Sequence, residues 1–499
     1  MNEEVGKGPR PRWDPCEVLE LPHPVGAYID GRWVLPRTNE TFRVEDPADL
    51  CEIAVVTAAD DTVVEYAVES AQTAFRSKWA SISPRARGQV LAGIAIEIRR
   101  QAEVLSYLET MDTGKPVSQA RSDVETSAQY FDYYAGAADK ITGDTLPEAE
   151  ELVAYSVREP YGVVAHITPW NSPMSQMCRG VAACLAVGNT AVVKPSELAP
   201  LSTLVMARLF VQCGLPPGVC NVVPGLGPTT GQAVVSHPLV RHVTFTGSIA
   251  TGQEVLRAAA TNITPCTLEL GGKSPTIVMA DANLRAAAHA GAMAVVRNSG
   301  QSCMATTRML VERPVLEEFV AHLGAEVAGL TMGHGLDDPD LGPLVSAGQR
   351  LRVLEYLRSA ERAGARVAAR SVKVTLPLGH FVEAAVLVDV TSDMPVAREE
   401  IFGPVQAVLC FDSLEEAVTL ANDSEYGLSA GVFTTSLSAA HYLAKRLEAG
   451  QVHVNRYQVG GVALPFGGYK QSGIGREKGL EALHHYTQLK TVVVAVDGG

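Results

Sequence analysis

Val163-Val-Ala-His-Ile167, Thr190-Ala-Val-Val-Lys194 and Val219-Cys-Asn-Val-Val223 are short apolar runs rich in β-branched residues, and segments of helical periodicity separate them. Two more such runs follow at 242–246 and 267–270. The intervening helices are expected at 175–187, 201–213, 229–236 and 249–260. Five short strands alternating with helices predict an open parallel sheet of the Rossmann-like type, which binds dinucleotides beyond the carboxyl ends of its strands.

The segments around this core predict further elements. Asp30-Gly31 supplies the turn of a hairpin over 27–34, and 141–158 alternates as a second strand pair. Helical periodicity is seen at 63–75, 84–110 and 117–138. A second α/β stretch runs from Thr276 to about Asn455, with strands expected at 308–312, 385–389, 405–411, 430–434 and 452–455. The run 489–495 reads as an exposed edge strand, and 1–24 as a loose arm.

Composition excludes several classes of protein. The 499 residues, with 46% hydrophobic residues, 19% charged residues and 44 glycines, fit an α/β enzyme of two or three domains. A net charge of −14 argues against a general nucleic-acid binder. Nine scattered cysteines without a CxxC pair indicate reduced thiols rather than disulfides or a metal site. With no signal peptide and no apolar run of membrane-spanning length, we expect a cytoplasmic protein.

Cys303 stands in Asn298-Ser-Gly-Gln-Ser-Cys303, among small and polar residues. A thiol that meets a substrate needs such surroundings, whereas a structural cysteine usually sits among aliphatic side chains. Gly300 allows close approach, and a turn leading into a helix would direct N–H groups at the sulfur and favour its thiolate. On local composition alone, a cysteine that acts as a small hydrophobe remains the commoner alternative.

Polar residues follow several predicted strands. Asn171, in Thr168-Pro-Trp-Asn171, could donate its amide to a developing negative charge, although the segment could equally be a plain loop. Lys194 and Glu197 follow the next strand and could bind ribose hydroxyls, and a carboxylate there would repel a 2′-phosphate. The glycine-rich segments 224–231 and 245–252 do not form a G-x-G-x-x-G fingerprint. Ser248 could cap a helix or donate to a phosphate.

Glu269 lies between two leucines at the end of a strand. Loss of hydration there would raise its pKa and suit it to general-base catalysis near neutral pH. The alternative is a structural carboxylate paired with Lys273.

These segments together resemble the aldehyde dehydrogenase superfamily, over the chain from about Ala27 to Val494. The resemblance rests on the motifs PWN, KPSE, FTGS, ELGGKSP, GQSC, EEIFGP and PFGGYKQSGIGRE, in that order. It implies NAD-dependent oxidation of an aldehyde to the acid through a thiohemiacetal and a thioester. Cys303 is similar to the nucleophile, Asn171 to the oxyanion-hole residue and Glu269 to the base that activates water. Glu477, in the GRE motif, is a secondary candidate for the base.

The resemblance also implies the cofactor contacts, with NAD preferred to NADP. Lys194 and Glu197 resemble the residues that hold the adenosine ribose, and Glu400 the one that binds the nicotinamide ribose. Ser248 is similar to the pyrophosphate contact. The other implied contacts are Ile167, Trp170, Gly231, Phe245, Leu270 and Phe402.

The family resemblance divides the chain into parts. It implies a dinucleotide-binding domain at 25–138 and 160–268 and a catalytic domain at 269–470. It also implies a small β extension, 139–159 and 485–499, that pairs between subunits of a homodimer or homotetramer.

Two arginines bear on the substrate. Arg179 and Arg297 occupy positions similar to those that grip a carboxylate in succinate-semialdehyde dehydrogenases, which predicts a polar or anionic semialdehyde. The sequence departs from that subfamily at Ser172 and at Gly460-Gly461, and Arg297 could be a structural ion pair. A broad-specificity small-aldehyde dehydrogenase and a thiol esterase with a vestigial cofactor site are the alternatives.

Overall fold

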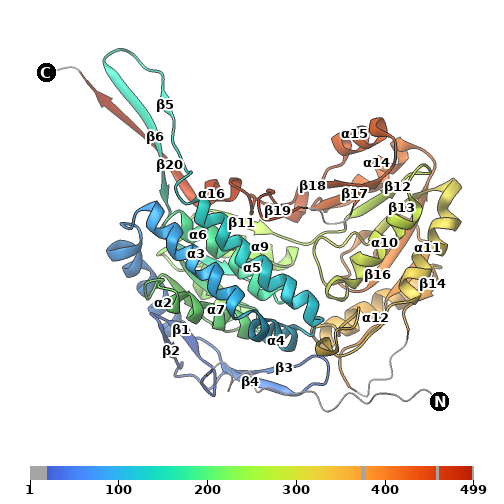
Figure 1. Ribbon diagram of the computed structural model, residues 1–499, viewed down its shortest axis with the longest axis horizontal. Coiled ribbons are helices and arrows are strands. Elements are labelled where there is room, and N and C mark those ends of the chain that lie inside the picture. Colours follow the sequence, from blue (N-terminus) through green and yellow to red (C-terminus); the bar gives the residue numbers. More distant parts are fainter. Residues whose placement is uncertain (1–19, 373–377, 457–459, 497–499) are drawn as a thin grey trace.

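The computed structural model describes residues 20–372, 378–456 and 460–496. The predicted arm, apart from residues 20–24, and Cys16 lie outside these ranges. Figure 1 shows two α/β bodies side by side and a narrow β ladder that projects away from them. None of the helices in these ranges is long and apolar enough to cross a lipid bilayer.

The first body contains an eight-stranded sheet in the order β19-β11-β10-β7-β8-β9-β1-β2. Its centre is parallel, as predicted. The central strands are β7 (Val163–Ile167), β8 (Thr190–Lys194), β9 (Cys220–Val222), β10 (Val240–Thr246) and β11 (Cys266–Glu269). The predicted hairpin, β1 (Ala27–Ile29) and β2 (Arg32–Val34), is confirmed and joins the sheet antiparallel to β9. A two-residue strand that was not predicted, β19 (Gly473–Ile474), closes the other edge against β11.

Helices cover both faces of this sheet because its strands are apolar on both sides. One face carries α3 (Pro84–Arg100), α4 (Ala102–Thr113), α5 (Val117–Ala137), α6 (Pro173–Ala186), α7 (Leu201–Gln212) and α16 (Glu481–His485). The other face carries α2 (Asp61–Ala74), α8 (Gln232–Val235) and α9 (Ile249–Ala260). Short π-helical turns, η1 (Phe75–Trp79) and η2 (Gly227–Gly231), extend α2 and precede α8.

Two helix predictions for this body were wrong in detail. The helix expected at 84–110 is two helices, because Gln101 leaves helical dihedral angles (φ −98°, ψ 15°). The helix expected at 229–236 begins as the π turn η2, where the Thr230 hydroxyl donates to the carbonyl oxygen of Ala59 over 2.7 Å.

The second body holds a seven-stranded sheet in the order β14-β15-β16-β13-β12-β17-β18. Its strands are β12 (Pro275–Val278), β13 (Arg308–Glu312), β14 (Arg366–Arg370), β15 (Ala385–Val388), β16 (Val405–Phe411), β17 (Ser429–Phe433) and β18 (Gln451–Val454). The five predicted strands are confirmed, whereas β12 and the antiparallel edge strand β14 were not predicted. Its helices are α10 (Leu284–Val296), α11 (Leu316–Ala328), α12 (Ala347–Arg362), α13 (Pro395–Arg398), α14 (Leu414–Asn422) and α15 (Leu437–Arg446).

The projecting ladder consists of β5 (Thr145–Leu146), β6 (Leu152–Pro160) and β20 (Thr487–Ala495). β20 pairs antiparallel with β6 over its whole length, from Thr487 opposite Pro160 to Ala495 opposite Leu152. Residues 139–159 and 485–499 were expected to pair between subunits. In the structure β6 and β20 of these segments pair with each other within one chain. The outer edge of β20 has no neighbouring strand among the described residues.

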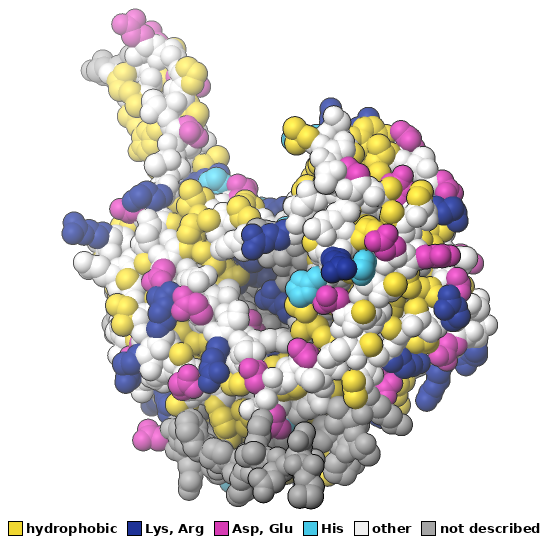
Figure 2. Space-filling view, turned by 45° about the vertical axis from the view of Figure 1, so that its right-hand side comes forward, with side chains coloured by type: hydrophobic (Ala, Val, Ile, Leu, Met, Phe, Trp, Pro, Cys, Tyr) yellow, Lys and Arg dark blue, Asp and Glu magenta, His cyan; other side chains and the backbone are white. Residues whose placement is uncertain are grey.

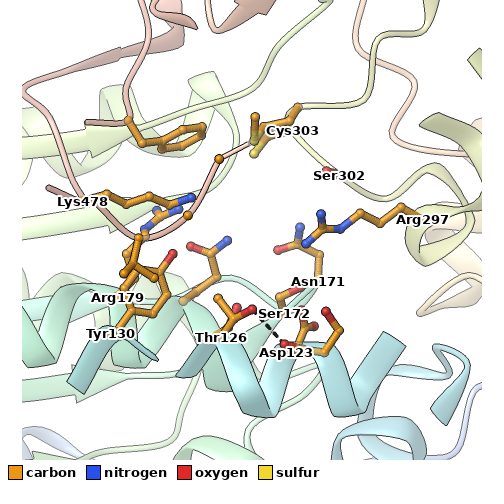
Figure 3. A pocket seen from close by; sticks show the side chains of 18 of the residues that line it. Asp123, Thr126, Tyr130, Asn171, Ser172, Arg179, Arg297, Ser302, Cys303 and Lys478 are labelled. Atoms are coloured by element: carbon orange, nitrogen blue, oxygen red, sulfur yellow. Dashed lines mark hydrogen bonds between the residues drawn. The ribbon is translucent and has the colours of Figure 1, made fainter. Parts of the chain in front are cut away.

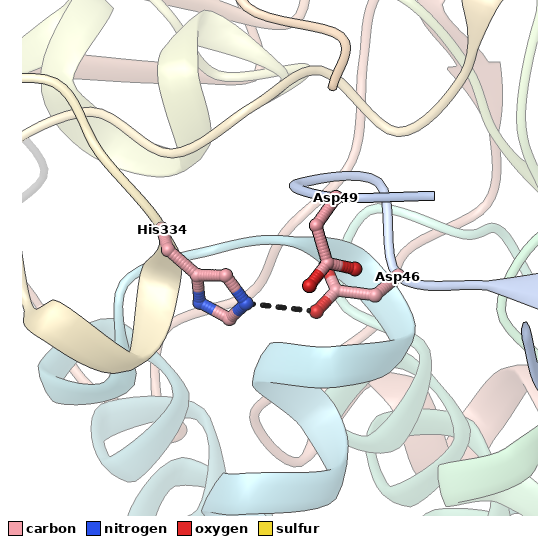
Figure 4. Close-up of side chains that lie close together, drawn as sticks. All are labelled: Asp46, Asp49 and His334. Carbon is pink, nitrogen blue, oxygen red and sulfur yellow. Dashed lines mark ion pairs between the residues drawn. The ribbon is translucent and has the colours of Figure 1, made fainter. Parts of the chain in front are cut away.

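A separate hairpin connects the two bodies at the opposite end of the molecule. It consists of β3 (Thr41–Glu45) and β4 (Glu52–Thr57), and its turn carries Asp46 and Asp49. The buried Asp46 lies 2.9 Å from Nε2 of His334 in the second body (Figure 4). Because Nδ1 of His334 accepts from the backbone N–H of Leu336, Nε2 carries the proton that faces Asp46. This contact between Asp46 and His334 links the first body to the second.

Candidate active site

The loop that carries Cys303 begins with a strained turn. After α10, residues 297–300 form a 3-10 turn in which Asn298 and Ser299 have φ of 48° and 53°. Gly300 follows with φ 75°, and a Cβ atom there would lie 2.2 Å from the carbonyl oxygen of Gly403. Gly300 thus allows the backbone of Gly403 to pack closely against this loop, whereas its role in giving a substrate access to Cys303 stays a prediction. Backbone strain of this kind is typical of functional loops.

The expected helix after Cys303 is absent. Cys303 and Met304 form a tight turn, and the chain then runs extended into β13 at Arg308. Burial raises the pKa of the Cys303 thiol to about 11, and the nearby guanidinium of Arg179 only partly offsets this effect. The prediction of a helix-favoured thiolate was therefore wrong: the thiol is protonated at neutral pH before a substrate arrives.

Cys303 lies where two cavities meet. The first, of about 220 Å³, is lined mostly by polar side chains from α5, α6, the 297–304 loop and the C-terminal segment (Figure 3). The second, of about 240 Å³, opens toward the carboxyl ends of the first sheet. Asn171, Gln176 and Cys303 line both cavities. A molecule in either cavity would therefore lie next to the sulfur.

Asn171 is fixed beside Cys303 by the same loop. The side-chain Nδ2 of Asn171 donates to the backbone carbonyl oxygen of Gln301 over 3.0 Å. The backbone carbonyl oxygen of Asn171 accepts from Nδ2 of Asn298 over 2.7 Å. An amide nitrogen has two hydrogens, so one N–H of Asn171 remains for a group bound in the cavities. The role of Asn171 as an oxyanion donor stays a prediction.

Glu269 lies at the end of β11 and lines the second cavity. Both of its carboxylate oxygens are buried without a hydrogen-bond partner among the described residues, and so is Nζ of Lys273. The pairing of Glu269 with Lys273, considered as an alternative, is therefore not formed. Burial raises the pKa of Glu269 well above its usual value, with a further contribution from the Glu477 carboxylate. A raised pKa makes the ionised carboxylate a stronger base toward water.

The second cavity gathers half of the predicted cofactor residues. Trp170, Ser248, Leu270, Glu400 and Phe402 line it. Oε1 of Glu400 accepts from the backbone N–H of Gly272 over 3.0 Å, and burial raises the pKa of Glu400 to about 7. The rings of Trp170 and Phe402 meet edge to face at 5.2 Å.

The other five predicted cofactor residues lie together at the carboxyl ends of the first sheet. Ile167 is in register with Lys194 on one side and with Phe245 on the other. Nζ of Lys194 lies 3.3 Å from the half-exposed Glu197 carboxylate, and a Cβ atom on Gly231 would lie 4.0 Å from the Lys194 side chain. Burial lowers the pKa of Lys194, which the Glu197 carboxylate partly counteracts.

Arg179 lines the first cavity but already has protein partners. Its guanidinium forms a buried ion pair with Glu477, donates to the Thr246 hydroxyl over 3.1 Å, and lies 5.3 Å from the ring of Phe466. The sequence did not predict this pairing, which also engages the secondary candidate for the base. Arg297, the other predicted substrate residue, reaches into the cavity from the opposite side (Figure 3).

Several residues of the site were not predicted from the sequence. Gln176 lines both cavities, and Tyr130 and Lys478 line the first. Gly271 has no room for a side chain, because a Cβ atom would lie 2.3 Å from Oε2 of Glu400. Lys478 directly follows the GRE motif, and this position was the sequence feature from which it could have been predicted. Tyr130 lies on a helix far away in sequence and gives no local signal.

An approachable thiol between a dinucleotide-type sheet and a polar cavity defines the chain as a thiol-dependent oxidoreductase of the two-body α/β type. The chain belongs to the aldehyde dehydrogenase family, whose model matches residues 33–492.

Named relatives share most of this length. Retinaldehyde dehydrogenase 3 of Rattus norvegicus is 42% identical over 475 residues, which are 94% of this chain and 93% of that protein. A betaine aldehyde dehydrogenase of Cereibacter sphaeroides is 41% identical over 471 residues, 94% of this chain and 97% of the relative. The solved NAD+ complex of an aldehyde dehydrogenase from Bacillus cereus has a TM-score of 0.92 and 42% identity, covering 95% of this chain and 96% of that one.

Proposed function

We propose that the chain oxidises a small polar or anionic semialdehyde to its carboxylic acid, with NAD as oxidant and Cys303 as nucleophile. The observation that carries this proposal is the position of Cys303, which lines both the polar cavity and the cavity at the sheet. The polar cavity, at about 220 Å³, is smaller than pockets for drug-sized ligands, which take ~300–1,000 Å³. It therefore suits a short aldehyde.

The residues present fit a dinucleotide. Gly271 carries no side chain, which lets the Glu400 carboxylate lie against the backbone of this loop, and this carboxylate can accept from ribose hydroxyls. Glu197 and Lys194 lie close together, where they can bind the hydroxyls of the adenosine ribose. Bound NAD supplies the hydride acceptor. We assign NAD rather than NADP, because the Glu197 carboxylate would repel a 2′-phosphate.

The remaining chemistry belongs to the chain's own side chains. The Cys303 thiol gives up its proton to water, and its sulfur bonds to the aldehyde carbon and forms a thiohemiacetal. The second amide N–H of Asn171 and the backbone N–H of Cys303 stabilise the oxyanion. After oxidation to the thioester, Glu269 takes a proton from water, whose oxygen attacks the acyl carbon. The carbon–sulfur bond breaks, and the acid and the free thiol result.

Replacement of the nucleophile tests this assignment. Cys303→Ser should lower NADH formation from any aldehyde by a factor of 10³ or more, because a serine hydroxyl is far less nucleophilic at neutral pH (~4 kcal/mol in the barrier). Cys410→Ser, a half-buried free cysteine in β16 outside both cavities, is the matched control. Native rates in Cys303→Ser would overturn the proposal. Hydrolysis of an activated ester by the wild type, without NADH formation from aldehydes, would favour the thiol esterase.

We further propose a cytoplasmic homodimer or homotetramer joined through the ladder. The free outer edge of β20 and the exposed apolar side chains of β6 and β20 support the association. All eight described cysteines are free, as expected in a reducing compartment.

A further inference from the structure

We infer that Lys478 is the residue that selects a carboxylate-bearing aldehyde, by pairing with the carboxylate at the far end of the substrate. This inference rests on the proposed function and goes beyond the arginines Arg179 and Arg297. It makes Lys478 a specificity-determining residue of the polar cavity.

The position of Lys478 supports a contact with substrate. It follows Glu477 directly, and it lines the polar cavity together with Cys303. Figure 3 shows its amine and the Arg297 guanidinium directed into the cavity from opposite sides, with Cys303 on a third side. Lys478 has φ 59°, a left-handed conformation that costs a lysine about 1–2 kcal/mol. The backbone thus holds a strained conformation that presents the amine to the cavity.

The amine of Lys478 has no anionic partner in the described part of the chain. Its contact there is with the ring of Phe466, 5.0 Å from Nζ, and no carboxylate lies within ion-pair distance. Glu477, the preceding residue, pairs with Arg179, and Asp123 of the cavity wall lies 2.6 Å from Nζ of Lys115. The Glu269 carboxylate acts on the charge of Lys478 through space but forms no hydrogen bond with it. A buried charge without a partner is costly, which makes it an attractive counter-ion for an incoming anion.

The charges around Lys478 also favour an anionic substrate. Burial, followed by repulsion from Arg179 and Arg297, lowers the pKa of Lys478 to about 8, while Cys303 and Glu269 act in the opposite direction. Figure 2 shows basic side chains in and beside a hollow at the centre of this face. A substrate carboxylate between Lys478 and Arg297 would relieve the repulsion. A neutral aldehyde would not, so the empty cavity favours the anion.

Arg179 is less suited to this task than its position in the sequence suggests. Its guanidinium is shared among Glu477, Thr246 and the Phe466 ring, and it is almost completely buried. A substrate carboxylate would have to compete with Glu477 for it. We therefore assign Arg179 to holding Glu477 in place, and the selective contact to Lys478.

A matched pair of aldehydes isolates the charge. Succinate semialdehyde ends in a carboxylate, and 4-methylpentanal has the same shape with an isopropyl group in that place. Lys478→Met should lower the ratio of kcat/KM for the anionic over the neutral aldehyde about 10- to 100-fold, chiefly through KM for the anion. This is the factor expected for the loss of one charge-assisted hydrogen bond.

Two variants serve as controls. Lys478→Arg keeps the charge and should retain most of the ratio. Lys445→Met removes one positive charge from the exposed side of α15, outside the cavity, and should leave the ratio unchanged. An equal loss for both aldehydes in Lys478→Met would overturn the inference, as would a wild type without preference for the anion. A wild type that oxidises neither aldehyde would refute the proposed function itself.

A measurement without turnover completes the test. Succinate should slow the alkylation of Cys303 by iodoacetamide in the wild type, read by mass spectrometry of the labelled peptide, whereas the neutral succinamide should not. In Lys478→Met, the succinate concentration that gives half of the maximal protection should rise about 10-fold or more. Unaltered protection in this variant would contradict a contact between Lys478 and the carboxylate.

Discussion

At the scale of single residues, burial shifts the pKa values of two site residues in opposite directions. It raises the pKa of the Cys303 thiol to about 11 and lowers the pKa of the Lys478 amine to about 8. Both shifts favour the neutral form, because a charged group loses hydration in the cavity. An anionic substrate changes this balance for Lys478, since its carboxylate stabilises the ammonium form.

This balance predicts a pH dependence of specificity. Below its pKa of about 8 Lys478 is protonated and binds the carboxylate, and above it the charge is lost. The ratio of kcat/KM for succinate semialdehyde over 4-methylpentanal should therefore fall between pH 7 and pH 9. Taking the ratio cancels the ionisation of Cys303, which both substrates require. Lys478→Arg should show a flat ratio over the same range, and a falling ratio in that variant would contradict the assignment.

Glu269 permits a second prediction at this scale. Its carboxylate oxygens have no partner among the described residues, so Glu269→Gln preserves the packing while it removes the base. Steady-state kcat should fall by about 10²–10⁴, with a burst of roughly one equivalent of NADH and an acyl group left on Cys303. Rapid-mixing absorbance and mass spectrometry of the intact protein measure the two effects. Full turnover in Glu269→Gln would assign the base elsewhere.

Which site residues the sequence reveals depends on how they are held. Asn171, Lys194 and Glu269 follow strands of a regular sheet, so their common edge follows from the order of elements. The partner of Arg179 could not be inferred, because Glu477 lies about 300 positions away and meets it only through the fold. The pKa of Cys303 was misjudged for a related reason, since burial is a property of the whole site.

At the scale of elements, the repeating parallel strands were the most predictable feature. The strands missed were those defined by their neighbours. β19 has two residues and exists because Gly473 and Ile474 pair with β11. β12 has only four residues and begins at Pro275, directly after the loop that follows Glu269. The break at Gln101 carries neither proline nor glycine, so nothing local marked it.

The loop between β11 and β12 carries a prediction about cofactor affinity. Gly271→Ala would place a Cβ atom 2.3 Å from the Glu400 carboxylate and displace it from the Gly272 N–H. NAD affinity, followed by the fluorescence of Trp170 and the other tryptophans, should weaken ~10-fold, equivalent to ~1.4 kcal/mol. Gly136→Ala in α5, with no atom near its new Cβ, should instead raise the free energy of unfolding by about 0.5–1 kcal/mol. Unchanged NAD affinity in Gly271→Ala would remove Glu400 from the cofactor site.

At the scale of the whole molecule, the projecting ladder is the feature that a single chain does not explain. Leu489 and Val493 on β20 are each 57% exposed, and more apolar side chains lie beside them. An exposed strand edge with apolar side chains is prone to pair with another chain. A second copy of the chain that covers the ladder would bury this surface.

Charges placed on the ladder test the association. The double variant Leu489→Glu and Val493→Glu should shift the protein toward monomers in light scattering coupled to size exclusion, because like charges would face each other across the interface. Ile263→Glu, at a 90% exposed apolar position outside the three ladder strands, is the control and should keep the native mass. An unchanged mass in the double variant would place the interface elsewhere.

The meeting of two cavities at one sulfur has a consequence for the traffic of small molecules through the enzyme. Apart from Asn171, Gln176 and Cys303 the two cavities are lined by different residues, so under the proposed function the dinucleotide and the acid would occupy separate spaces. Under the proposed mechanism water hydrolyses the thioester with Glu269 as base, a step that consumes no oxidant, so a cell short of oxidised dinucleotide would leave Cys303 without an acyl group.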